Sequence, residues 1–101
     1  GLRVLEKMAA AAGGVTNHRM GLYDAILIKN NHVDLAGGVA NAITRARIAG
    51  LPIEIEVRDH AELEQALAQG VARVLLDNMT PEQAAEEIRF VGGRAEVELS
   101  G

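Results

Sequence analysis

The amino-acid sequence predicts an α/β fold in which parallel βα repeats form about half of a (β/α) barrel. Strand-like apolar segments alternate with helix-like segments at a twenty-odd-residue spacing, which implies right-handed βαβ crossovers and a parallel sheet. The composition, 49% hydrophobic and 24% charged, is typical of a soluble globular segment. The chain has 101 residues, whereas a complete barrel needs about 250 residues. We therefore expect residues 1–101 to be part of one domain, either an arc of an incomplete TIM-like barrel or an open doubly wound sheet.

The first half of the chain is expected to contain two helices and one strand. Residues 2–12 are rich in Leu, Met, Ala, Glu and Lys at helical spacing, and Gly13-Gly14 ends this helix. Residues 24–29 are a short apolar run bounded by polar residues, which is typical of a buried strand. Residues 37–49 again have the composition of a helix, and Gly50-Leu51-Pro52 follows it as a turn.

The next βα unit follows directly. Residues 53–57 alternate with a period of two and are rich in β-branched residues, so they predict a strand. Either Asp59 or His60 is suited to cap a helix over residues 61–69, and Gly70 is suited to end it.

The last segments repeat the pattern. Residues 74–76 predict a third strand, and Thr80-Pro81 is a helix start with a capping residue and a proline in the first turn. That helix is expected to run to about Val91, where Gly92-Gly93 ends it. Residues 95–99 then predict a fourth strand.

An ionisable residue stands at the end of each predicted strand. These residues are Lys29, Glu56, Asp77 and Glu98. The carboxyl ends of parallel strands share one rim of the sheet, where ligands bind in such folds. We therefore expect one cation and three carboxylates to converge on a concave surface.

Two further glutamates lie two positions before the strand ends. Glu54 shares a strand face with Glu56, and Glu96 shares one with Glu98, because side chains on a strand repeat with a period of two. For Glu54 and Glu96 we favour the alternative that they face helices and form ion pairs there.

A histidine and an arginine lie in residues 16–22, which are expected to be a loop before the first predicted strand. Arg19 offers a bidentate fork suited to carboxylate or phosphate, and His18 adds a hydrogen-bond donor. Placed next to Lys29, they would form a cationic wall opposite the carboxylates. The loop after the strand adds amides and His32, but no further residue stands at a spacing that predicts a metal site.

Composition excludes several classes of function. The chain has no cysteine, so thiol catalysis and thiolate metal sites are excluded, and a cytosolic location is favoured. Its formal net charge of −4 and its two aromatic residues make nucleic acid an unsuitable partner. No apolar run approaches the ~18 residues needed to span a membrane, so we expect no membrane partner.

Five motifs together resemble the quinolinate phosphoribosyltransferases, also called carboxylating nicotinate-nucleotide pyrophosphorylases. The motifs are GGVTNHRMGLYD at 13–24, LIKNNH at 27–32, IEV at 55–57, LDNM at 76–79 and ELSG at 98–101. They follow the family's order at about its spacing. Many members have Asp where Asn30 stands, a departure that leaves the neighbouring Lys29 and His32 in place. The resemblance implies a barrel of the type II phosphoribosyltransferase kind.

The resemblance also implies a reaction. Phosphoribose is transferred from phosphoribosyl pyrophosphate to the nitrogen of quinolinate, giving nicotinate mononucleotide, CO₂ and diphosphate in NAD biosynthesis, with Mg²⁺ accompanying the diphosphate. His18 and Arg19 match residues that hold the quinolinate carboxylates, and Lys29 matches an active-site lysine. Glu56 and Asp77 match acidic residues near the ribose. By the same resemblance, Ser100 and Gly101 begin a phosphate-binding stretch.

The family's N-terminal domain and its last barrel strands have no counterpart in the chain. We therefore expect a partial catalytic domain, without activity when isolated, and a cytoplasmic homo-oligomer as the native form. Two alternatives remain open. One is a non-catalytic half-barrel module that self-associates through unpaired strand edges. The other is a molybdenum-transport-associated relative of the same fold, which typically lacks the signature at residues 29–32.

Overall fold

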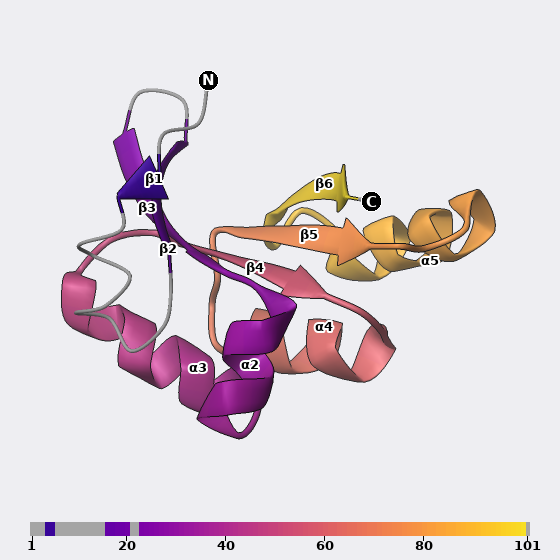
Figure 1. The fold of residues 1–101 in the computed structure, drawn as a ribbon. Coiled ribbons are helices and arrows are strands. Elements are labelled where there is room, and N and C mark those ends of the chain that lie inside the picture. Colours follow the sequence, from indigo (N-terminus) through magenta and orange to yellow (C-terminus); the bar gives the residue numbers. More distant parts are fainter. Residues whose placement is uncertain (1–3, 6–15, 21–22, 101) are drawn as a thin grey trace.

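The computed structural model describes residues 4–5, 16–20 and 23–100 of the chain, and Figure 1 shows how its strands and helices are arranged. The strands are β1 (Val4–Leu5), β2 (Thr16–Met20), β3 (Tyr23–Ile28), β4 (Ile53–Val57), β5 (Arg73–Asp77) and β6 (Glu96–Ser100). The helices are α2 (Asn30–Ala36), α3 (Val39–Ala46), the short 3₁₀ helix η1 (Arg47–Ala49), α4 (His60–Ala68) and α5 (Pro81–Val91). Strands and helices alternate from β3 onward, as the sequence predicts.

The strands form one six-stranded sheet whose order in space is their order in the chain. Strands β3, β4, β5 and β6 are parallel to one another. The predicted four-stranded parallel sheet with its connecting helices is thereby confirmed. Strands β1 and β2 add an antiparallel edge beside β3, which the sequence did not predict.

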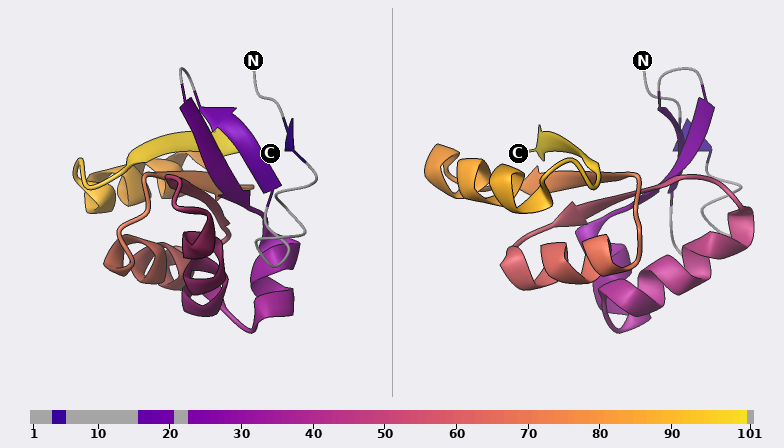
Figure 2. Two further views of the ribbon diagram at one scale, coloured as in Figure 1. Left: turned by 90° about the vertical axis from the view of Figure 1, so that its left-hand side faces the viewer. Right: turned by 180° about the vertical axis from the view of Figure 1, so that it is seen from behind.

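The two faces of the parallel strands differ in chemistry. On one face, Ile55 of β4 and Val74 of β5 are fully buried in the apolar core. Residues from α2, α3, α4 and α5 complete that core. Figure 2 shows these helices on one side of the sheet, with the other side left uncovered by helices. The uncovered face, here called the concave face, carries alternate residues such as Glu54 and Arg73, because successive side chains of a strand point to opposite faces.

The starts of α4 and α5 have ordinary physical causes. Asp59 is the N-cap of α4, and its side chain accepts a hydrogen bond from the Glu62 backbone N–H at 2.9 Å. Thr80 caps α5 in the same way, through the Gln83 backbone N–H at 3.2 Å. Such caps stabilise a helix by about 1 kcal/mol each. The predicted start of α5 and its end at Val91 are confirmed.

Helix α3 begins later than predicted. The expected helix over residues 37–49 starts at Val39 and becomes η1 after Ala46. Gly37 (φ 88°) and Gly38 (φ 132°) form the bend between α2 and α3. Both angles lie in the left-handed half of conformational space, which only glycine adopts readily, so these two residues separate the helices instead of joining α3.

Three local predictions are wrong. Residues 30–36 form helix α2 instead of a loop after the strand. Residues 16–20 form β2 instead of a loop, because pairing with β3 satisfies their backbone groups. Val4 and Leu5 form β1, paired with β2, where a helix over 2–12 was expected; the rest of that expected helix lies outside the described residues.

None of the helices in the described part of the chain is long and apolar enough to cross a membrane.

Candidate functional site

The ends of β3, β4 and β5 meet at one residue, Asn30. Its backbone N–H donates a hydrogen bond to Glu56 Oε1 at 3.0 Å. Its side-chain Nδ2 donates another to Asp77 Oδ2 at 2.7 Å. Both contacts are partly buried and join segments 26 and 47 residues apart in the chain. The predicted convergence of Glu56 and Asp77 at the carboxyl rim is therefore present, and Asn30 connects them.

The amide of Asn30 has one orientation that suits Asp77. Turned over, it would set its oxygen against a carboxylate oxygen, and two acceptors without a proton between them repel. In the orientation present, Asn30 Oδ1 is buried and has no hydrogen-bond partner among the described residues. The orientation of the amide is thus set by its bond to Asp77.

Lys29 stands beside this group as the N-cap of α2, with its side chain exposed. Its backbone N–H donates to His32 Nδ1 at 3.2 Å, so the neutral imidazole carries its proton on Nε2. Burial lowers the pKa of His32, nearby Lys29 lowers it further, and Glu56 opposes both effects. His32 is thus a neutral hydrogen-bonding group at neutral pH.

Glu98 lies on β6 opposite Leu75, the same residue that Glu56 faces from β4, so the two glutamates stand at one level of the concave face, as predicted. Their contacts differ. The carboxylate of Glu98 binds Arg73 Nη1 at 2.9 Å, and Glu96 binds Arg73 Nη2 at 2.7 Å. Glu98 therefore belongs to the ion pairs around Arg73, whereas Asn30 binds Glu56 and Asp77, with Lys29 beside them.

Glu54 and Glu96 do not face helices, which corrects a prediction. Glu54 lies beside Arg73 in the sheet, with Oε2 and Nε 3.7 Å apart, and only 1% of its side chain is exposed. Arg73 thus meets three carboxylates on the concave face, and the hydrogen bonds that it donates to Glu96 and then to Glu98 raise its pKa. Since an isolated charge is costly to bury, this cation makes the buried glutamate tolerable there.

His18 and Arg19 lie on β2, in line with the start of β3. They pair with Ala25 and Asp24, which precede Lys29 by four and five positions. A strand advances about 3.3 Å per residue, so the backbone of Lys29 lies about 13–17 Å farther along the strand direction than the backbones of His18 and Arg19. The cationic wall stays a prediction, because it depends on the side chains of His18 and Arg19, of which the structure describes only the backbone.

Ser100 ends β6 directly beside Asp77 in the register of the sheet. Its backbone therefore lies at the same rim as the group around Asn30. Gly101, predicted with it to begin a phosphate-binding stretch, lies outside the described residues.

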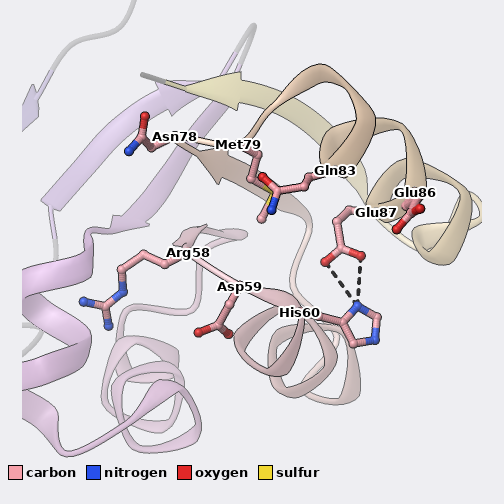
Figure 3. Close-up of a pocket in the computed structure, with 8 residues that line it drawn as sticks. All are labelled: Arg58, Asp59, His60, Asn78, Met79, Gln83, Glu86 and Glu87. Carbon is pink, nitrogen blue, oxygen red and sulfur yellow. Dashed lines mark hydrogen bonds and ion pairs between the residues drawn. The ribbon is translucent and has the colours of Figure 1, made fainter.

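A cavity of about 350 Å³ lies between the starts of α4 and α5 (Figure 3). Its lining residues are Arg58, Asp59, His60, Asn78, Met79, Gln83, Glu86 and Glu87. None of the predicted site residues is among them.

His60 Nδ1 lies 2.9 Å from Glu87 Oε1 and 3.1 Å from Oε2, so this pair joins α4 to α5. His60 was expected to act only at its own helix start, and the sequence offered no signal for its contact with α5.

The contact between His60 and Glu87 makes a pH-dependent contribution to stability. The hydrogen bond with Glu87 raises the pKa of His60 above 6.5, and the charges of Glu87, Glu64 and Asp59 act in the same direction. A raised pKa means that the stabilisation is fully present below about pH 6.5. It is lost as the pH rises through the folded-state pKa. We expect His60→Gln to reduce the thermal stability of the complete gene product that carries these residues more at pH 6 than at pH 9.

Thermal unfolding of the wild type and the variant at both pH values checks this expectation. Arg94→Gln is a suitable comparison, because Arg94 stacks on the same Phe90 ring that His60 contacts but does not titrate in this range. An equal loss of stability for His60→Gln at pH 6 and pH 9 would contradict the assignment.

No group of three or more His, Cys, Asp or Glu side chains able to hold a metal ion occurs in the described ranges. Glu56 and Asp77 nevertheless provide two carboxylates that bind one residue, Asn30. Such a donor set suits a hard cation that also binds substrate phosphates.

Comparison with known proteins gives one consistent family. The model of the family described as "Quinolinate phosphoribosyl transferase, C-terminal domain" matches residues 1–101. A probable carboxylating nicotinate-nucleotide pyrophosphorylase of Bacillus subtilis is 38% identical over 100% of this chain and 36% of its own length. The chloroplastic enzyme of that name from Arabidopsis thaliana is 34% identical over 100% of this chain and 35% of its own.

Solved structures agree. NadC from Streptococcus pyogenes has a TM-score of 0.73 and 42% identity, over 88% of this chain and 32% of that one. A nicotinate-nucleotide pyrophosphorylase from Francisella tularensis gives the same four values. The chain thus spans about a third of the length of the relatives it matches.

Proposed function

The chain belongs to the quinolinate phosphoribosyltransferase family, and we propose that it supplies part of the active site of an enzyme of NAD biosynthesis. The proposed reaction joins the ring nitrogen of quinolinate to the anomeric carbon of phosphoribosyl pyrophosphate. The bond from that carbon to diphosphate breaks, and diphosphate leaves with the electron pair. The adjacent carboxylate then leaves as CO₂, a proton takes its place on the ring, and nicotinate mononucleotide is the product.

The observation that carries this proposal is the pair of carboxylates held by Asn30 at the strand ends. Glycosyl transfer passes through a transition state that resembles an oxocarbenium ion. Fixed negative charges beside the ribose stabilise such a cation as diphosphate departs. In this proposal Glu56 and Asp77 are those charges, and they are placed before the reaction begins.

Lys29 provides the opposite charge at the same rim. Its exposed ammonium, at the end of β3, is free to approach an anionic substrate. Its proposed role is to bind and orient quinolinate or the departing phosphates. Such fixed orientation removes entropy from the reacting pair before the chemical step.

His18, Arg19, Ser100 and Gly101 enter the proposal through the family resemblance. His18 and Arg19 are assigned to the quinolinate carboxylates, which a guanidinium fork can bind through two hydrogen bonds. Ser100 and Gly101 are assigned to phosphate. The position of Ser100 beside Asp77 in the sheet supports its assignment.

Mg²⁺ is the proposed cofactor, bound together with phosphoribosyl pyrophosphate. When bound, it neutralises charge on the diphosphate. Glu56 and Asp77 are the residues that fit it, because Mg²⁺ is commonly held by one or two carboxylates together with substrate phosphates.

The cytoplasm and a homodimer are the proposed location and assembly. The bacterial relatives and the absence of cysteine support a cytosolic location, although relatives in Oryza sativa and Arabidopsis thaliana are chloroplastic. The homodimer enters the proposal through the family resemblance.

The test is an assay of the complete gene product with quinolinate, phosphoribosyl pyrophosphate and Mg²⁺. We expect nicotinate mononucleotide and CO₂ to form in equal amounts, as measured by chromatography and by release of labelled CO₂. Nicotinate in place of quinolinate is the matched control and should give no product. Turnover of nicotinate without turnover of quinolinate would contradict the proposal.

A further inference from the structure

Asn30 touches both proposed catalytic carboxylates, and it does so through two different parts of the residue. The contact with Glu56 uses the backbone N–H, which every residue except proline would offer. The contact with Asp77 uses the side-chain amide, which depends on the identity of the residue. Substitution at this position therefore changes the contact with Asp77 and leaves the donor to Glu56 in place.

The side-chain amide of Asn30 also suits this position because it is uncharged. Glu56 and Asp77 are like charges held by the same residue, and each uses one oxygen to accept a hydrogen bond from Asn30. A neutral donor between two carboxylates binds them without adding a third negative charge. The bond to Asp77, at 2.7 Å, is in the short range of hydrogen bonds to an ionised group.

We propose that Asn30 is a positioning residue that holds Asp77 in its reactive orientation against Glu56, and so acts on catalysis through Asp77. This inference rests on the proposed function. The partly buried bond from Asn30 Nδ2 to Asp77 Oδ2, which joins residues 47 positions apart in the chain, supports it. In this role the amide turns one Asp77 oxygen toward itself and directs the other toward substrate.

A double-mutant cycle in the complete gene product tests the inference. Asn30→Ala removes the donor to Asp77, and we expect it to lower kcat by about tenfold with a smaller change in KM, since one hydrogen bond to a charged group is lost. In an Asp77→Asn background the same substitution should change kcat less than twofold, because the group through which it acts is already neutral. Asn30→Leu, which keeps the volume of the side chain, should behave like Asn30→Ala.

Asn41→Ala is the matched control. Asn41 also donates one side-chain hydrogen bond, to the Ala36 carbonyl at 3.2 Å, but it lies on α3 away from the rim. Its loss should lower thermal stability without changing kcat. If Asn30→Ala likewise changed only stability, Asn30 would be structural and the inference would be wrong.

The remaining outcomes are separable. Equal losses from Asn30→Ala in the wild-type and Asp77→Asn backgrounds would show that Asn30 does not act through Asp77, and would overturn the inference while leaving the proposed function in place. A wild-type protein without turnover of quinolinate would overturn the proposed function and the inference with it.

Discussion

Asp77→Asn is expected to lower kcat of the complete gene product for quinolinate by about 10²–10³-fold, the usual effect of removing one group that stabilises transition-state charge. Asp77 ends β5 and accepts the hydrogen bond from Asn30. An asparagine has the same shape, and its amide oxygen can still accept that bond. The substitution therefore removes the negative charge while preserving the contact, so a loss of rate reports the charge. Steady-state kinetics with saturating Mg²⁺ gives the measurement.

Glu82→Gln controls for a change of carboxylate to amide. Glu82 is exposed in the first turn of α5. There its negative charge interacts favourably with the helix dipole and stabilises the helix by about a few tenths of a kcal/mol. We expect its kcat to match that of the wild type. A kcat for Asp77→Asn within threefold of the wild-type value would show that Asp77 is not a catalytic residue.

Ile55→Ala is expected to lower the free energy of unfolding by about 2–5 kcal/mol. Ile55 is fully buried in the middle of β4, between the sheet and the helices. Truncation there loses the transfer free energy of the removed carbons and leaves a cavity that packed neighbours cannot fill. Urea denaturation followed by circular dichroism measures the change.

Ile55→Val separates the size of the side chain from its position. It removes one methylene group and should cost about 0.5–1.5 kcal/mol. Leu35, by contrast, is 80% exposed in the described structure, so Leu35→Ala should change stability by less than about 0.5 kcal/mol. Equal costs for Ile55→Ala and Leu35→Ala would contradict the packing described for β4.

The parallel part of the fold was predictable because its signals are local and strong. The alternation in residues 53–57 predicts β4 with its correct first and last residues, and the helix start at Thr80-Pro81 predicts α5. Helix α2 was missed because Asn30 and Asn31 are weak helix formers, and glycines follow only seven residues later. Strand β2 was missed for a different reason. Polar and apolar residues alternate poorly along β2. These residues form a strand because they pair with the edge of β3, and no local sequence pattern reveals that pairing.

The candidate site was predictable in part for the same reason. The position of charged residues at the ends of strands placed Glu56 and Asp77 at one rim, since this follows from topology alone. Their bridge through Asn30 depends on where an amide points, which spacing in the sequence does not report. Glu98 stands at the level of Glu56, as topology predicts, but spacing in the sequence does not report its ion pair with Arg73 on the neighbouring strand.

The charges on the concave face also bear on the register of the sheet. If β4 slipped by one residue against β5, Glu54 and Glu56 would move beneath the helices, where unpaired carboxylates are prohibitively costly. The alternation of charged and apolar residues along β4 thus also protects the chain from misaligned pairing of its own strands.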